Sequence, residues 1–267
     1  MLQGRRLVAV NLSDNLTAMV LTYNEAPNLE RCLNSLQWVP RILIVDSGST
    51  DETLAIAHQF NNTTVQHRPF DNFADQCNFG LSKITSDWAL SLDADYELTP
   101  ELIAELRSLD VGPTSAAAFE AGFIYRIYGK PLRGTLYPPR KILYQTAAAS
   151  YKNEGHSHRV NIDGRVEKLT GKLYHDDRKP LSRWLTSQRN YAKLEADHLA
   201  STPKSSLKRN DYIRSLAWPA PLLVFAYTLV VKRSILDGWA GWFYALQRLL
   251  AETILALELI DRKLGGK

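Results

Sequence analysis

The sequence predicts an α/β fold, an open and mostly parallel β-sheet flanked by helices, with a helical extension after residue 200. Strand-like and helix-like segments alternate four times before residue 100, which is typical of βαβ units. Three of the predicted strands end in polar clusters, at residues 22–25, 46–49 and 93–95. Because the carboxyl ends of parallel strands share one edge of a sheet, these clusters predict a ligand site at that edge.

The first two strands are predicted from short apolar runs that end in turn residues. Residues 16–22 form a buried strand, after which Asn28 is placed to cap a helix. A second strand spans residues 41–45 and ends at an aspartate. Ser49 and Glu52 have the spacing of a capping box, so we expect the second helix to start there.

The next elements continue this alternation. Residues 64–67 form a short strand, and a helix near residues 73–84 leads to the strand at residues 88–92, where apolar and small side chains alternate. Thr99 then caps a helix that begins with Pro100. Beyond it we expect a strand region, a turn and a further strand, at residues 116–127, 129–134 and 137–144.

Asp93 and Asp95 follow the fourth strand with one residue between them. In extended backbone, residues two apart project to the same side, so both carboxylates can converge on one point. Carboxylates that close repel one another unless a cation lies between them. A hard divalent ion such as Mg²⁺ or Mn²⁺ suits the pair, particularly where substrate phosphates complete its coordination. The alternative is a solvated acidic turn that leads into the following helix.

Composition separates a nearly neutral body from a basic tail. The chain has 267 residues, 45% of them hydrophobic, enough for one large domain with an appendage. From Ser201 onward there are ten Lys and Arg against five Asp and Glu. Two cysteines and the absence of a secretory signal at the start favour a reducing, cytosolic compartment. The sequence contains neither Gly-x-Gly-x-x-Gly nor a phosphate loop, so it does not support a dehydrogenase or a P-loop enzyme.

The basic tail is also apolar. Residues 216–231 carry no charge but contain two prolines, and the run is shorter than the roughly 20 residues of a spanning helix. Beyond it, apolar side chains from Ile235 to Leu257 fall on one helical face. We therefore expect amphipathic elements on the inner face of the cell membrane, and no nucleic acid partner. The alternative is that this face packs on the rest of the chain or on a second subunit.

Three motifs in order carry a resemblance to a known family. They are Thr-Tyr-Asn-Glu-Ala at residues 22–26, Val-Asp-Ser-Gly-Ser-Thr-Asp-Glu-Thr at residues 45–53 and Leu-Asp-Ala-Asp at residues 92–95. The chain thus resembles family 2 glycosyltransferases with the GT-A fold, in particular the bacterial lipopolysaccharide-core β-glucosyltransferases. The resemblance is dense over residues 16–107 and looser beyond them.

The resemblance implies roles for the matching positions. The nucleotide-sugar donor would be bound by Thr22, Tyr23, Asn24, Glu25, Asp46, Ser47, Asn78, Asp93 and Ala94. A Mg²⁺ or Mn²⁺ ion would be bound by Asp93, Asp95 and His175, although a lone histidine is often a capping or core residue. The acceptor side would include Arg140, Gln188 and Arg189, with a solvated role for Arg140 as the alternative.

An inverting transfer also needs a base that deprotonates the acceptor hydroxyl. Relatives often carry a glutamate just before a Val-Asp-Gly turn, and Asp163 with Gly164 anchors that motif here. On this anchor the glutamate position falls on His158, whose unperturbed pKa lies near neutrality. Glu154 is the rival if the loop is shifted, and a structural role for the histidine is also open.

Together these features predict a metal-dependent inverting glycosyltransferase that moves a hexose from a nucleotide sugar to a lipid-linked or lipopolysaccharide acceptor. Glucose is the expected hexose and UDP the expected nucleotide. We expect a catalytic domain over residues 1–200, with a donor half at 14–110 and an acceptor half at 111–200, and a helical segment at 201–267. Self-association is left open. The rival functions are a silent nucleotide-binding adaptor at the membrane and a sugar-phosphate nucleotidylyltransferase.

Overall fold

The computed structural model describes residues 12–112, 116–154 and 157–265. The chain divides into two compact units. The first comprises Met1–Phe123, Pro138–Lys152 and Arg159–Asp176, and the second comprises Ile124–Tyr137, Asn153–His158 and Asp177–Lys267. These boundaries reflect packing within the chain, whereas the functional boundary expected at residue 200 stays a prediction.

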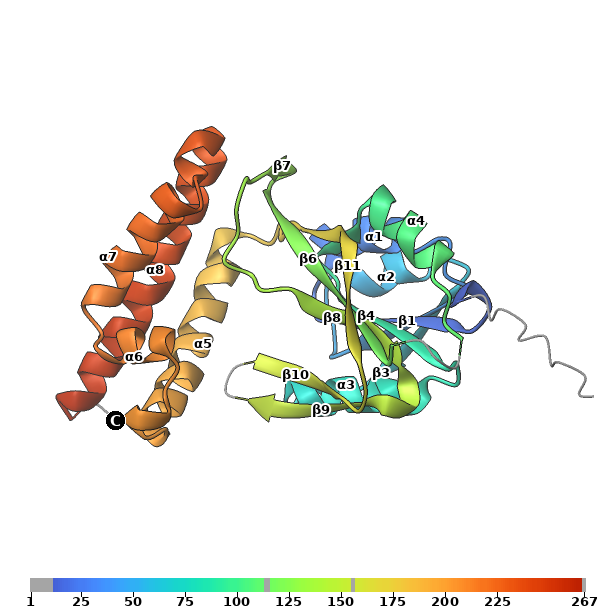
Figure 1. Ribbon diagram of the computed structural model, residues 1–267, viewed down its shortest axis with the longest axis horizontal. Coiled ribbons are helices and arrows are strands. Elements are labelled where there is room, and N and C mark those ends of the chain that lie inside the picture. Colours follow the sequence, from blue (N-terminus) through green and yellow to red (C-terminus); the bar gives the residue numbers. More distant parts are fainter. Residues whose placement is uncertain (1–11, 113–115, 155–156, 266–267) are drawn as a thin grey trace, which may run out of the picture. The chain divides into compact units, whose positions relative to one another are not determined.

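The first unit is built on a mixed sheet in which strands follow the order β3-β2-β1-β4-β8-β6-β11-β5 (Figure 1). The strands of this path are β1 (Leu16–Thr22), β2 (Arg41–Asp46), β3 (Thr63–His67), β4 (Trp88–Asp93), β5 (Tyr96–Leu98), β6 (Ala118–Ile127), β8 (Arg140–Gln145) and β11 (Val166–His175), and β7 (Lys130–Pro131) pairs with β6 off the path. The first four strands run parallel, and β8 pairs with β4 in the antiparallel direction. The predicted α/β class is therefore confirmed.

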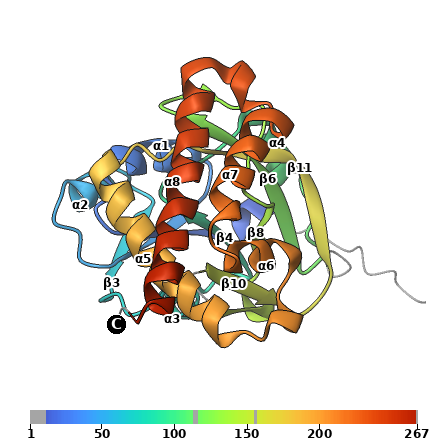
Figure 2. The ribbon, with the colours of Figure 1, turned by 90° about the vertical axis from the view of Figure 1, so that its left-hand side faces the viewer.

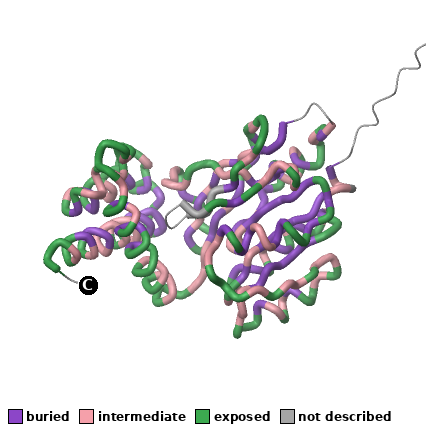
Figure 3. Tube along the Cα trace, turned by 90° about the horizontal axis from the view of Figure 1, so that it is seen from below, coloured by how far each residue is buried: buried purple, intermediate pink, exposed green. Residues whose placement is uncertain are grey.

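Helices cover both faces of this sheet. Figure 1 shows α1 (Ala26–Ser35), α2 (Thr53–Ala57) and α4 (Pro100–Ser108) on one face and α3 (Phe73–Lys83) on the other. Because of this double cover, β1 and β2 are apolar and buried along nearly their whole length, and the strands form the buried centre of the unit in Figure 3. A separate pair of strands, β9 (Ala149–Glu154) and β10 (Ser157–Ile162), forms a second small sheet.

The predicted strands and the cap of α4 are confirmed. Strand β1 has the predicted bounds, and β2, β3, β4 and β8 differ from the prediction by a few residues at an end. Thr99 Oγ1 accepts a hydrogen bond from Leu102 N at 3.2 Å, which is the predicted cap of α4.

Two predicted helix starts are wrong because the side chains taken as caps bond elsewhere. Helix α1 begins at Ala26, so Asn28 lies inside it and donates its amide to Glu25 Oε2 at 3.0 Å. Helix α2 begins at Thr53, and Ser49 bonds to an aspartate of β2 in place of a capping box. The turn expected at residues 129–134 also contains a short strand, β7 (Lys130–Pro131), that pairs with β6.

The second unit is mainly helical. Its helices are α5 (Leu181–Ser201), α6 (Arg209–Ser215), α7 (Pro219–Ala226) and α8 (Gly238–Lys263). Helices α5 and α7 both lie along α8 (Figure 2), and small residues such as Ala192 and Ala196 form the contact between α5 and α8. A Cβ at Gly241 would collide with the carbonyl oxygen of Ser234, so glycine allows the close approach of α8 to the preceding turn.

Ion pairs add to this helical packing. Arg214 of α6 lies 2.5 Å from Glu195 of α5 and 3.1 Å from Glu252 of α8. In the described ranges, no single helix is long and apolar enough to cross a membrane; one bent pair, Pro219–Val231 with Ser234–Lys263, passes that test jointly at an angle of 66°.

Candidate active site

The three polar strand ends meet at one edge of the sheet. Strand β1 lies between β2 and β4, and the parallel register pairs Thr22 with Asp46 and Leu21 with Asp93. The carboxyl ends of these strands therefore lie side by side, as the order of the motifs predicts. We call this edge, formed by residues 22–25, 46–53 and 93–96, the polar edge.

Asp46 organises the loop that follows β2. Its side chain is buried and accepts hydrogen bonds from Thr22 Oγ1 at 2.8 Å, Gly48 N at 2.8 Å, Ser49 N at 2.9 Å and Ser49 Oγ at 2.5 Å. Burial alone raises the pKa of Asp46, but the hydrogen bonds from Ser49, Thr22 and Gly48 favour the ionised form and hold the pKa below its ordinary value. Gly48 has a φ of 94°, which glycine adopts without strain.

Asn24 ties the loop after β1 to the loop after β2. Its backbone is left-handed, with a φ of 53°, a conformation that asparagine tolerates better than most residues. Its Oδ1 accepts from Thr50 N at 2.7 Å, and its own N–H donates to Ser49 Oγ at 2.8 Å. The neighbouring Glu25 N–H donates to Thr53 Oγ1 at 2.6 Å. The two loops are therefore held together as one platform.

Asp93, the last residue of β4, forms an ion pair with Arg140, the first residue of β8. Arg140 Nη1 lies 2.6 Å from Asp93 Oδ2 and donates to Tyr96 Oη at 2.9 Å. The guanidinium also lies over the Tyr96 ring, 5.7 Å from its centroid. The antiparallel register explains the pair, because Leu90 lies opposite Leu143 and three further residues along each strand lead to Asp93 and Arg140.

Asp95 lies in a turn, so the strand period used to predict its direction does not apply to it. Its Oδ2 lies 3.2 Å from Nε2 of His175, the last residue of β11. Its backbone carbonyl accepts from Asp176 N at 3.2 Å, and Asp176 in turn forms an ion pair with Arg31 at 3.3 Å. The structure thus brings His175 to Asp95 through the pairing of β11 with β5 beside the turn, while its role as a metal ligand stays a prediction.

The donor atoms at the polar edge suit a hard divalent ion that has few protein ligands. Within the described part of the chain, no three His, Cys, Asp or Glu side chains are grouped to hold a metal ion by themselves. Mg²⁺ is usually bound by one or two carboxylates and completes its coordination with waters and substrate phosphates. The carboxylates of Asp93, 35% exposed, and Asp95, 14% exposed, fit an ion of this kind.

Asn78 of α3 fixes the strand β9. Its amide donates to Tyr151 O at 3.0 Å and accepts from Tyr151 N at 2.9 Å, so it pairs with the backbone as a neighbouring strand would. Strands β9 and β10 also carry Glu154 and His158, the two candidates for the base. The side chains of both lie outside the described part of the structure, so their roles stay predictions.

The other expected site residues are divided between the two units. At the polar edge, Ser47 Oγ accepts from Gln76 Nε2 at 2.9 Å, Tyr23 is exposed and Ala94 is buried. The expected acceptor residues on α5 belong to the second unit and are Gln188 and Arg189.

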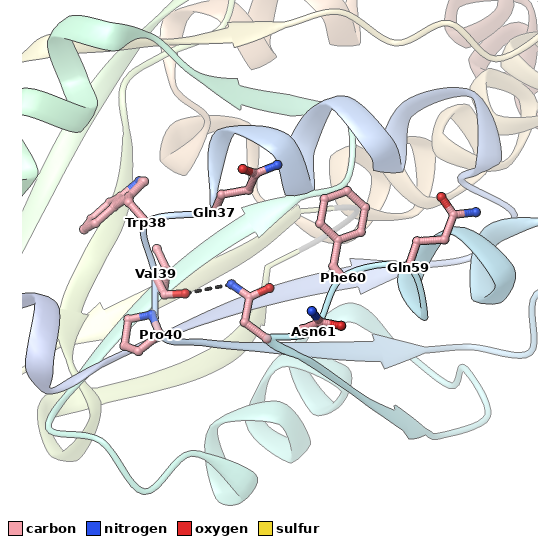
Figure 4. A pocket seen from close by; sticks show the side chains of 8 residues that line it. Gln37, Trp38, Val39, Pro40, Gln59, Phe60 and Asn61 are labelled. Atoms are coloured by element: carbon pink, nitrogen blue, oxygen red, sulfur yellow. Dashed lines mark hydrogen bonds between the residues drawn. The ribbon is translucent and has the colours of Figure 1, made fainter.

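A shallow hollow at the other end of the parallel strands offers a different environment (Figure 4). It is lined by Gln37, Trp38, Val39, Pro40, Gln59, Phe60, Asn61 and Asn62. Asn62 Nδ2 donates to Val39 O at 2.8 Å within it. These residues precede β2 and β3, and none of the eight is charged, so the hollow does not suit a diphosphate.

A helix-flanked, half-parallel sheet with an acidic pair at the switch to antiparallel strands defines a GT-A type of enzyme. Comparison with known proteins identifies the family to which the chain belongs. Residues 17–159, more than half of the chain, match the model of glycosyl transferase family 2. The chain belongs to this family, and it is a glycosyltransferase.

Relatives and solved structures agree with this assignment. An uncharacterized glycosyltransferase of Rickettsia felis is 27% identical, covering 94% of this chain and 92% of the relative. The lipopolysaccharide core biosynthesis glycosyltransferase LpsC of Rhizobium meliloti is 26% identical, covering 71% of this chain and 73% of LpsC.

Two solved structures show the same fold. S. aureus TarS 1–349 in complex with UDP-GlcNAc is 16% identical, with a TM-score of 0.50 and coverage of 94% of this chain and 92% of TarS. Mannosyltransferase PcManGT from Pyrobaculum calidifontis, in complex with GDP-Man and Mn²⁺, is 16% identical, with a TM-score of 0.52 and coverage of 94% and 86%. The expected GT-A fold is thereby confirmed.

Proposed function

We propose that this glycosyltransferase moves a hexose, with inversion, from a UDP-sugar to a lipid-linked or lipopolysaccharide-type acceptor, with glucose as the expected hexose. The observation that carries the proposal is the convergence of three polar strand ends at the polar edge. A nucleotide-sugar donor is supported by TarS, which was crystallised with UDP-GlcNAc, and by PcManGT, which was crystallised with GDP-Man. The similarity to LpsC supports an acceptor of the lipopolysaccharide core.

In this proposal the donor lies on the platform made by the loops after β1 and β2. Thr22, Tyr23 and Glu25 contribute to its binding, together with the nearby Ser47 and Ala94. Asp46 and Asn24 contribute to donor binding indirectly, because their side chains hold the two loops in place. Asn78 acts in the same indirect way through β9.

Asp95 and Asp93 would hold a Mg²⁺ or Mn²⁺ ion together with the donor diphosphate, and PcManGT was crystallised with Mn²⁺. When bound, such an ion stabilises the negative charge that develops on the departing diphosphate. His175 holds the Asp95 carboxylate at 3.2 Å and itself packs against the rings of Tyr96 and Phe123, at 5.1 and 6.0 Å. His175 therefore orients Asp95, whether or not it also reaches the ion.

The acceptor hydroxyl must lose its proton as it attacks the anomeric carbon. Glu154 and His158 remain the two candidates for the base, and Gln188 and Arg189 the expected acceptor contacts on α5. The pH dependence of kcat/KM separates the candidates. A carboxylate base places the acid limb near pH 4 and a histidine places it near pH 6.5, and only the variant of the true base, Glu154→Gln or His158→Gln, abolishes that limb.

A cytoplasmic location at the inner face of the cell membrane is part of the same proposal. It is supported by apolar side chains exposed on α7, α8 and the residues beside α7, which include Trp218, 75% exposed, and Val230, 69% exposed. Lys232 and Arg233 lie in the turn that links these helices. Exposed tryptophans, aliphatic side chains and basic residues are the composition of helices that lie in a lipid interface.

The donor assignment is tested by the thermal stability of the purified protein. UDP with Mn²⁺ should raise the Tm, and GDP or dTDP with Mn²⁺ should raise it less, because ligands that bind the folded state stabilise it. Transfer from UDP-glucose to a lipopolysaccharide-core acceptor should then be detected by mass spectrometry. No stabilisation by any of the three nucleotides would contradict a nucleotide-sugar donor.

The membrane assignment is tested with vesicles that contain phosphatidylglycerol. Replacing Trp218 and Trp239 by serine should weaken vesicle binding by about tenfold, since each indole contributes interfacial apolar area. The control is Tyr191→Ser, which changes an aromatic residue of α5 that is 36% exposed. Equal binding by the wild type and the double variant would count against this surface.

A further inference from the structure

Arg140 forms an ion pair with Asp93, one of the two carboxylates that the proposed metal site needs. Its Nη1 lies 2.6 Å from Asp93 Oδ2, and the two side chains are 27% and 35% exposed. The pair is thus in contact with solvent at the polar edge, where an arriving ligand can reach it. The inference drawn from it rests on the proposed function, since it concerns how that metal ion and the donor bind.

A guanidinium and a divalent cation compete for Asp93. Two positive groups a few ångströms apart repel one another, and a single cation within about 4–6 Å already shifts the charge equilibrium of a carboxylate by one to three powers of ten. With Arg140 in place, the charge of Asp93 is already balanced. Asp95 is then the acidic ligand left at the turn, and without substrate phosphates one carboxylate holds Mg²⁺ or Mn²⁺ more weakly than two.

The structure also fixes where Arg140 lies before a donor arrives. Tyr96 accepts a hydrogen bond from Arg140 Nη1 at 2.9 Å, and its ring lies under the guanidinium. Tyr96 is buried and packs edge to face on Phe123 and His175, both at 5.1 Å. The guanidinium is therefore held on one side by a fixed ring, while 27% of the Arg140 side chain remains exposed.

We propose that Arg140 keeps a metal ion off Asp93 until a nucleoside diphosphate is present, and that it then transfers its hydrogen bonds from Asp93 to the diphosphate. The planar guanidinium matches phosphate oxygens as well as carboxylate oxygens, so the exchange preserves its hydrogen bonds. Asp93 is released to the ion in the same step. Arg140 is in this way a positioning residue that makes metal and donor bind together.

The test is Mn²⁺ binding to the full chain, followed by the electron paramagnetic resonance signal of free Mn²⁺. Without nucleotide, Arg140→Gln should bind Mn²⁺ about tenfold more tightly than the wild type, because the competing charge is gone. In EDTA, the same variant should bind UDP about tenfold more weakly, because the diphosphate loses a cationic partner. A purely structural role for Arg140 would weaken both ligands alike.

Two further variants keep the test decisive. Arg165→Gln removes the same charge from the same unit at a residue that is 66% exposed and paired with Glu167, and it should leave both affinities unchanged. Tyr96→Phe keeps Arg140 but removes one of its hydrogen bonds, so it should tighten Mn²⁺ binding by about threefold. If Arg140→Gln does not fold, Tyr96→Phe takes its place in the test.

The outcomes separate the inference from the function on which it rests. If Arg140→Gln, or Tyr96→Phe in its place, binds Mn²⁺ no more tightly than the wild type, the inference is overturned while the metal site stands. If the wild type fails to bind Mn²⁺ even with UDP, the metal site of the proposed function is itself wrong, and the inference falls with it.

Discussion

Asp46 and Asp93 have the same place in the sheet and opposite surroundings. Each ends a parallel strand beside β1, one on either side of it. Asp46 is buried under hydrogen bonds from its own loop and from Thr22, whereas Asp93 is 35% exposed and paired with Arg140. A carboxylate enclosed by N–H and O–H groups shapes the loop, while a partly exposed carboxylate that is paired with an arginine is open to a ligand.

The difference follows from the residues after each strand. Gly48 lets the chain turn back so that two backbone N–H groups point at Asp46. After Asp93 the chain enters a turn and then β5, so its carboxylate is met by a residue of β8 instead. Two strand ends of the same parallel sheet therefore differ in their exposure to a ligand, according to the loop that follows each.

The largest expected effect is on the ligand-binding side of this comparison. Asp95→Asn should lower the rate of transfer from UDP-glucose by about a thousandfold or more, because charge stabilisation by a metal ion is worth several kcal/mol. The Tm should change little. Steady-state kinetics with Mn²⁺ and a melting curve measure both, with Glu101→Gln on the exposed face of α4 as the control. Undiminished turnover would refute the metal assignment.

The second effect is on the structural side. Asp46→Asn should reduce the free energy of unfolding by about 2 kcal/mol, because backbone and hydroxyl donors lose a charged acceptor. Since the folded pKa of Asp46 lies below its ordinary value of 3.8, its contribution is present above about pH 4 and is lost as the pH falls further. Urea unfolding at pH 7 and pH 3 should therefore show a smaller difference between variant and wild type at pH 3.

The platform formed by the two loops predicts a third, smaller effect. Asn24→Ala should cost about 1–2 kcal/mol, because alanine is strained at a φ of 53° and lacks the acceptor for Thr50 N. Asn24→Gly removes the same side chain but tolerates the backbone, so it should cost less. Chemical denaturation of the pair separates backbone strain from hydrogen bonding. An equal loss in both variants would assign the whole effect to the side chain.

The smallest effect tests the exposed ion pair itself. Arg140→Gln should change the free energy of unfolding by less than about 1 kcal/mol, because a partly exposed pair contributes little to stability. High salt should reduce that difference further, while the cost of Asp46→Asn should not depend on salt. Denaturation at 0.1 M and 1 M NaCl, values chosen for their different screening, measures both. A salt-dependent cost for Asp46→Asn would break the comparison.

Most of the fold was predictable because its strands are short apolar runs that end in polar residues. The prediction failed where one side chain had several partners to choose from. Ser49 fits a capping box in sequence but bonds to Asp46, and Asn28 fits a cap but lies within α1. The spacing of residues within a helix does not reveal a hydrogen-bond acceptor from outside that helix, and in both cases such an acceptor bonds to the predicted cap residue.

The site, like the fold, was predictable only in part. The order of the motifs places Asp46 and Asp93 at one edge, but it does not contain the order of the strands beyond β4. The contact between Asp93 and Arg140, 47 residues apart, depends on β8 lying next to β4. The role of Tyr96 beneath that pair depends on the same neighbour and was missed.

The reversal of direction between β4 and β8 has a consequence for changing the enzyme. A parallel neighbour brings only its last residue to the polar edge, whereas β8 arrives there with its first. Libraries that vary the opening position of such an incoming strand would retune the charge offered to the sugar nucleotide. The four-stranded parallel half, with its buried scaffold, would be left untouched.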